Sequence, residues 1–125
     1  MAGAKKRILI VDDDTDIRQV LSDRMSSWGY AVETANDGRE ALDALERGKF
    51  DGMLLDMRMP GIDGNGVLRR TRESHPALPV VVVTATSVKE SAAQAVAPGA
   101  CAYLIKPFDA TQLKQTVEQC FGPAA

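Results

Sequence analysis

The sequence has few cysteines and no long apolar segment, and both absences exclude classes of protein. Its two cysteines, Cys101 and Cys120, form no C-x-x-C pair and have no histidine or cysteine neighbours suited to zinc. We therefore expect two reduced thiols in a cytosolic protein. No apolar stretch approaches the roughly 20 residues that span a bilayer, and Met1–Arg7 lacks the apolar core of a signal peptide. These features predict a cytoplasmic protein with no membrane partner.

An excess of positive charge is also absent, because the formal net charge is −2 with both signs mixed. Nucleic-acid-binding domains usually carry a basic patch, so we expect no binding to nucleic acid. With 125 residues, of which 45% are hydrophobic, the chain can bury one core but has no room for two. We therefore expect one compact domain.

The chain does contain a regular alternation of short apolar runs and helical patterns. Runs that are apolar throughout are typical of strands buried on both faces. We expect strands over Arg7–Val11, Ala31–Ala35, Asp51–Leu55, Val80–Val83 and Ala102–Ile105. Apolar spacing and capping residues predict helices over Asp14–Trp28, Gly38–Arg47, Asn65–Glu73, Ser87–Val96 and Asp109–Phe121. Five β–α units in a row predict an α/β fold, a doubly wound parallel sheet with helices on both faces.

Polar residues follow four of these apolar runs directly. They are Asp12-Asp13-Asp14, Asp56, Thr84 and Lys106. The carboxyl ends of parallel strands meet at one edge of the sheet, where open α/β sheets build their sites. Asp14 is best explained as the cap of the first helix, but a helix needs one cap and not three. We therefore expect the other polar residues to converge on one site.

Several carboxylates in one crevice repel each other, and a hard cation relieves that repulsion. Mg²⁺ prefers oxygen ligands and would suit one or two of these carboxylates, with a backbone carbonyl as a further candidate. Lys106 can hold a carboxylate or a phosphoryl oxygen, and Thr84 can donate a hydrogen bond to the latter. A carboxylate can itself act as a nucleophile and form an aspartyl-phosphate. The residue types thus favour a divalent cation and phosphoryl chemistry.

These residues and their surroundings resemble the receiver domain of two-component response regulators. The matching stretches are Ile8–Asp14, Leu54–Gly64, Val83–Ala85, Gly99–Ala100 and Tyr103–Phe108. The resemblance spans about Arg7 to Phe121, and it implies a single receiver domain over residues 1–125 with its core at about 7–121. It also implies the flavodoxin-like sheet with strand order 2-1-3-4-5.

The resemblance implies a role for each acidic residue of the site. Asp56 would be the phosphoacceptor. Asp13 would bind Mg²⁺ directly, and Asp12 would do so directly or through water. Asp56 and the backbone carbonyl of Arg58 would complete the protein ligands, with Mn²⁺ as an alternative ion.

Three further residues take roles from the same resemblance. Thr84 and Lys106 would bind oxygens of the transferred phosphoryl group, and Thr84 would act with Tyr103 as the conformational switch. The peptide bond between Lys106 and Pro107 would be cis. The domain would not be an enzyme acting on a separate substrate, since it would catalyse only its own phosphorylation and dephosphorylation.

The implied partners follow from this chemistry. The phosphoryl donor would be the phosphohistidine of a sensor histidine kinase or of a histidine phosphotransfer protein. The output surface would be formed by residues 87–96, 102–105 and 109–121. That surface would bind an output partner or domain, or a second copy of the chain in a phosphorylation-dependent homodimer.

Two other interpretations fit part of the sequence. A phosphatase similar to the haloacid dehalogenase family would also use an aspartate, Mg²⁺, a threonine and a lysine. However, Thr15 falls one position too early for its D-x-D motif, and no later acidic pair completes its metal site. A pseudo-receiver that serves only as an interaction module would lack a site residue, and none is missing here.

Overall fold

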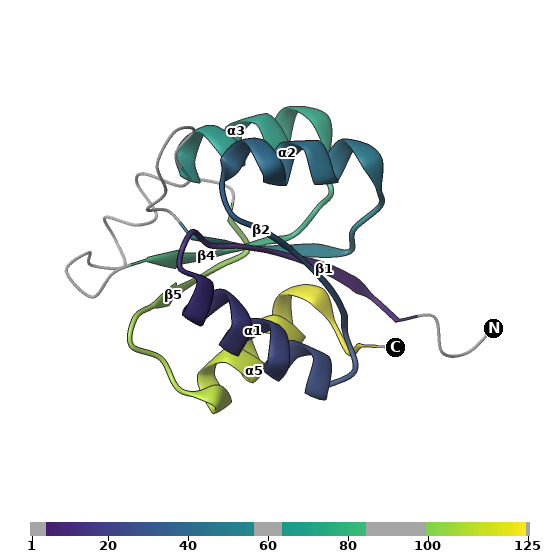
Figure 1. Cartoon of the computed structure of the whole chain (residues 1–125). Coiled ribbons are helices and arrows are strands. Elements are labelled where there is room, and N and C mark those ends of the chain that lie inside the picture. Colours follow the sequence, from purple (N-terminus) through teal and green to yellow (C-terminus); the bar gives the residue numbers. More distant parts are fainter. Residues whose placement is uncertain (1–4, 57–63, 85–99, 125) are drawn as a thin grey trace.

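The computed structural model describes residues 5–56, 64–84 and 100–124 of the chain (Figure 1). The strands are β1 (Arg7–Val11), β2 (Ala31–Ala35), β3 (Gly52–Asp56), β4 (Val80–Thr84) and β5 (Ala102–Ile105). The helices within the described residues are α1 (Thr15–Ser27), α2 (Gly38–Arg47), α3 (Gly64–Ser74) and α5 (Ala110–Phe121). The helix expected over Ser87–Val96 lies outside the described residues. None of the described helices has the length and apolarity needed to cross a bilayer.

The five strands form one parallel sheet in the order β2-β1-β3-β4-β5, which confirms the predicted topology. The register aligns the ends of neighbouring strands, since Val11 pairs with Leu55 and Asp56 pairs with Val83. Thr84 likewise pairs with Ile105. The carboxyl ends of β1, β3, β4 and β5 therefore lie together along one edge of the sheet.

Helices cover both faces of the sheet, with α2 and α3 on one face and α1 and α5 on the other (Figure 1). Because side chains alternate along a strand, each inner strand contributes to two apolar clusters. The side chains buried toward α2 and α3 include Leu9, Val11, Met53, Leu55, Val80 and Val82. Those buried toward α1 and α5 include Ile8, Ile10, Leu54, Val81 and Val83. Burial on both faces explains why these strands are apolar throughout.

Caps fix the ends of the two helices that flank the site. The Asp14 carboxylate accepts hydrogen bonds from the backbone N–H groups of Asp16 (2.9 Å) and Ile17 (3.2 Å), so Asp14 caps α1 as predicted. Gly29 follows the end of α1 with φ of 99°, a conformation that favours glycine. Asp109 caps α5 in a capping box with Gln112. These caps fix where α1 begins after Asp14 and where α5 begins after Lys106 and Pro107.

The two cysteines contradict the sequence-based prediction. Cys101 and Cys120 are joined by a disulfide in the structure, so the prediction of two reduced thiols is wrong. The reason lies in the topology, since α5 runs back along the sheet and ends beside the start of β5. The two Cα atoms are 6.0 Å apart, which is within the range of bridged cysteines.

Candidate functional site

Asp12 and Asp13 directly follow β1 and differ in exposure. Asp12 is buried, with 1% of its surface exposed, whereas Asp13 is exposed. The Asp12 backbone N–H donates to the carbonyl of Ala35 (3.2 Å), which extends the pairing of β1 with β2 by one residue. One carboxylate oxygen of Asp12, Oδ1, accepts from the backbone N–H of Asp14 (2.9 Å). This bond fixes the side chain and leaves its second oxygen available.

Asp56 and Thr84 are the last residues of β3 and β4, and both are buried. The sequence placed them just after their strands, but each still pairs in the sheet, as Asp56 with Val83 and Thr84 with Ile105. Because β3 lies between β1 and β4, the Asp56 carboxylate is central in the row of strand ends.

Lys106 completes the arrangement from the end of β5. Its backbone N–H donates to the carbonyl of Thr84 (2.8 Å), and the Lys106–Pro107 peptide bond is cis, as predicted. The Lys106 Nζ lies 3.8 Å from Oδ2 of Asp12 and 3.9 Å from Oδ2 of Asp56. The ammonium therefore bridges the two buried carboxylates.

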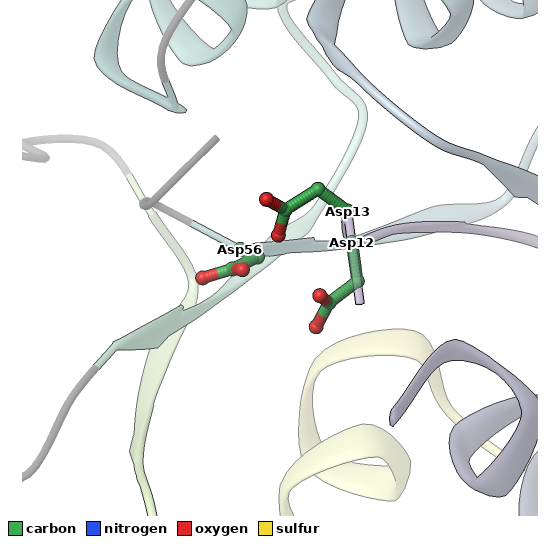
Figure 2. Close-up of side chains that lie close together, drawn as sticks. All are labelled: Asp12, Asp13 and Asp56. Atoms are coloured by element: carbon green, nitrogen blue, oxygen red, sulfur yellow. The ribbon is translucent and has the colours of Figure 1, made fainter. Parts of the chain in front are cut away.

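The three carboxylates form one cluster beyond the strand ends (Figure 2). Asp12, Asp13 and Asp56 each offer an oxygen, and these oxygens lie within 4.8 Å of one another. The Asp12 Oδ2 atom is buried and accepts no hydrogen bond from the described residues, because the Lys106 Nζ at 3.8 Å is too distant to donate one, so this oxygen is an orphaned acceptor that could bind a cation. Lys106 balances one of the three negative charges, and a divalent cation would balance the other two. The cluster therefore fits a hard cation with oxygen ligands.

Of two further residues predicted from the sequence, the structure describes Tyr103 but not Arg58. The backbone carbonyl of Arg58, expected as a metal ligand, lies outside the described residues. Tyr103 is half-buried on β5, where it pairs with Val82 and packs on the α2/α3 face of the sheet. Thr84 lies two residues beyond Val82, so Thr84 and Tyr103 share a face on neighbouring strands.

Arg18 holds the loop after β1, a role that was not predicted from the sequence. Its guanidinium donates to the backbone carbonyl of Asp12 (2.8 Å). A cation near a helix N-terminus opposes the helix dipole. This unfavourable position of Arg18 in the first turns of α1 could have indicated, from the sequence alone, that its side chain has a specific partner. Arg18 positions the backbone between Asp12 and Asp13.

An apolar groove between α1 and the start of α5 shares Lys106 with the site. The groove has a volume of about 380 Å³, and its lining includes Ile17, Val20, Lys106 and Phe108. Val20 is 51% exposed, and it is the one large hydrophobic side chain found exposed within the described part of the chain. The groove thus offers an apolar surface beside the Lys106 ammonium.

Comparison with known proteins gives consistent matches over nearly the whole chain. The family described as the response regulator receiver domain matches residues 8–118. The transcriptional regulatory protein ZraR of Escherichia coli K12 is 42% identical over 115 residues, covering 92% of this chain and 26% of ZraR. The DNA-binding transcriptional regulator NtrC of Klebsiella pneumoniae is 42% identical over 113 residues, covering 90% of this chain and 24% of NtrC. The chain thus spans about a quarter of the length of these curated relatives.

Solved structures agree with these matches. The response regulator protein TrrA of Thermotoga maritima, solved in complex with Mg²⁺-BeF, superposes with a TM-score of 0.83 at 32% identity, covering 92% of this chain and 98% of TrrA. NtrX of Brucella abortus, in complex with ADP, superposes with a TM-score of 0.87 at 33% identity, covering 94% of this chain and 27% of NtrX. The similarity thus extends from the sequence to the fold.

Proposed function

Because the chain belongs to the response regulator receiver domain family, we propose that Asp56 accepts a phosphoryl group from a phosphohistidine. The observation that carries this proposal is the central, buried Asp56 carboxylate, held 3.9 Å from the Lys106 ammonium in a cluster of three acidic residues. The donor is a sensor histidine kinase or a histidine phosphotransfer protein.

The transfer requires little covalent chemistry from the protein. An oxygen of Asp56 attacks phosphorus, the bond from phosphorus to the donor nitrogen breaks, and the imidazole nitrogen keeps the electron pair. The product is a mixed anhydride of carboxylic and phosphoric acid. Catalysis then consists of positioning and of charge neutralisation, because the nucleophile is already an anion. Lys106 faces the oxygens of the incoming group, and the Thr84 hydroxyl donates to one of them.

Asp12, Asp13 and Asp56 would hold the cation that this chemistry uses. Mg²⁺, or Mn²⁺ in its place, supplies positive charge next to the phosphoryl oxygens when bound. TrrA was solved with Mg²⁺ and a beryllofluoride group, and the orphaned Oδ2 of Asp12 supports the same assignment here. The carbonyl of Arg58 remains a proposed further ligand.

Incubation with acetyl phosphate tests this function without knowledge of the kinase. We expect the intact mass to rise by one phosphoryl group when Mg²⁺ is present and to stay constant in excess chelator. Hydroxylamine should remove the label, because acyl phosphates react with it and phosphate esters do not. A label that resists hydroxylamine would refute an acyl phosphate.

The donor protein has to bring its phosphorylated imidazole to Asp56. We propose that it docks on the apolar groove between α1 and the loop that joins β5 to α5. The groove lies beside Lys106 and carries the exposed Val20.

Residues 1–125 would act as one cytoplasmic receiver domain, with a core at about 7–121. The output would reside elsewhere in a longer protein or in a separate partner.

We further propose that Thr84 and Tyr103 transmit the phosphorylation state. They share the α2/α3 face of the sheet on neighbouring strands, so movement of Thr84 toward a phosphoryl oxygen frees space near Tyr103. Burial raises the pKa of Tyr103 above the ordinary value of 10.0, so its hydroxyl, which is neutral near pH 7 in any case, stays neutral at higher pH as well. Tyr103 also lines a pocket with Gln112 and Gln115 of α5. Its rotation inward would change this surface of β5 and α5, where an output partner or a second copy would bind.

Removal of the Thr84 hydroxyl should separate phosphorylation from this response. With Mg²⁺ and beryllofluoride, a mimic of the phosphoryl group, we expect large amide shifts at Tyr103 and Gln115 in the wild type. Thr84→Ala should lose most of these shifts, while Thr84→Ser, which keeps the hydroxyl, should retain them. Lys114, also on α5, is a third reporter of the same surface. Full shifts at Tyr103 and Gln115 in Thr84→Ala would contradict the proposed coupling.

A further inference from the structure

The disulfide between Cys101 and Cys120 lies at the end of the sheet opposite the carboxylate cluster. Cys101 immediately precedes β5, and its backbone N–H donates to the carbonyl of Val80 at the start of β4 (2.7 Å). Cys120 is the penultimate residue of α5. The parallel strands end at the carboxylate cluster, so the bridge and Asp56 are separated by the length of the sheet.

Contacts other than the bridge hold both cysteines in place. Val117, three residues before Cys120, and Phe121, directly after it, are buried in the α1/α5 cluster, against which Cys120 also packs. The hydrogen bond to Val80 places Cys101. The two Cα atoms would therefore stay within bridging distance after the bond is broken. The bond can open and close without refolding of the domain.

The bridge is accessible from solvent, because Cys101 is exposed and Cys120 is half-buried. Thiol–disulfide exchange requires an external thiolate to reach one sulfur of the bridge, and access is one of the factors that set its rate. An exposed disulfide between two preformed positions has the properties of a labile bond rather than a purely structural one.

We propose that Cys101 and Cys120 form a reversible redox modification site that fixes the end of α5 to the start of β5. On reduction, the thiolate of a small-molecule or protein thiol attacks the Cys101 sulfur, and Cys120 leaves as a thiolate. A second thiol attacks the mixed disulfide and releases Cys101, so two thiols become one disulfide and the two cysteines take up two protons. Oxidation is the reverse exchange with a small-molecule disulfide such as glutathione disulfide.

The bridge closes a ring that contains all of β5 and all of α5 except Phe121, and thus also Tyr103 and Lys106. Oxidation therefore limits how far α5 can move away from β5 at its carboxyl end. The phosphorylation chemistry itself should be unaffected, since the bridge lies at the opposite end of the sheet from Asp56. If the proposed switch holds, oxidation would restrain the output surface while leaving phosphorylation intact; this consequence alone rests on the proposed function.

The test compares the intact chain after treatment with glutathione disulfide and after treatment with dithiothreitol. Alkylation with iodoacetamide followed by intact-mass measurement should find two reactive thiols in the reduced chain and none in the oxidised chain. A bridge across a ring of this size should raise Tm by roughly 10 °C. Amide hydrogen exchange at the carboxyl end of α5 should slow on oxidation.

Cys101→Ser and Cys120→Ala serve as matched variants. After treatment with glutathione disulfide each should stop at a mixed disulfide with one glutathione, seen as added mass, because no second cysteine displaces the glutathione. Each should also lose the dependence of Tm on bridge formation. Two alkylatable thiols in the oxidised wild type, a disulfide found only between two chains, or an unchanged Tm would overturn the proposal. Labelling by acetyl phosphate provides a separate readout, because its failure in both redox states would count against the proposed function and not against the redox site.

Discussion

The variant Asp56→Asn should gain no phosphoryl group from acetyl phosphate in the presence of Mg²⁺. The asparagine side chain has the shape of the aspartate but no anionic oxygen to attack phosphorus. Lys106 keeps one of its two carboxylate partners, Asp12 at 3.8 Å, so the surroundings of the lost nucleophile should persist. Intact-mass measurement should therefore find the variant unlabelled under conditions that label the wild type.

A second aspartate variant provides the control for this experiment. Asp43→Asn removes an exposed carboxylate of α2, away from the strand ends, and should be labelled to the same extent as the wild type. Circular dichroism should find both variants folded. Labelling of Asp56→Asn at the wild-type level would place the phosphoacceptor at another residue and would end the assignment of Asp56.

The sequence predicted the strands well because the sheet is covered on both sides. An inner strand such as β4 exposes no side chain to water, so it begins with four consecutive valines and is recognisable without any periodicity. The ends of β3 and β4 were each placed one residue early, at Leu55 and Val83. Pairing in a sheet depends on the backbone and not on side-chain polarity, so Asp56 and Thr84 continue their strands although their side chains belong to the site.

The convergence of the site residues could be predicted, because the carboxyl ends of parallel strands share one edge of the sheet. Other contacts could not be predicted, because no local sequence pattern indicates them. Parallel strands place Asp12, Asp56 and Lys106 at one edge whatever lies between them. The bridge from Cys101 to Cys120 depends instead on where α5 ends relative to β5, and a separation of 19 residues does not encode that distance. The order of the strands also came from the family resemblance and not from the spacing of residues.

Replacement of Asp13 should weaken Mg²⁺ binding strongly. Asp13 is the exposed member of the cluster, and its carboxylate has an oxygen within 4.8 Å of oxygens of Asp12 and Asp56. Loss of one of three carboxylates near a divalent cation should reduce the affinity by about 10- to 100-fold, since each such charge contributes on the order of a few kcal/mol before desolvation is subtracted. Calorimetric titration of Asp13→Asn with MgCl₂ measures this directly, without any phosphoryl donor.

The same substitution should have the opposite effect on stability when no cation is present. Asp13→Asn removes a negative charge from beside two others, so the repulsion in the folded state falls and Tm in chelator should rise by roughly 2–5 °C. A variant that binds Mg²⁺ weakly because it is poorly folded would instead have a lower Tm. The two measurements together separate the loss of a ligand from damage to the fold.

The matched control for this experiment is Asp14→Asn, which removes the same charge one residue further along. The Asp14 carboxylate caps α1 through the N–H groups of Asp16 and Ile17, and asparagine is an equally good cap. A cation held by direct coordination should therefore depend on Asp13 far more than on Asp14. A cation attracted only by the summed negative charge should lose affinity equally in both variants. Equal Mg²⁺ affinities in Asp13→Asn and Asp14→Asn would therefore refute Asp13 as a ligand, because the two substitutions differ in which carboxylate faces the cluster and not in the charge they remove.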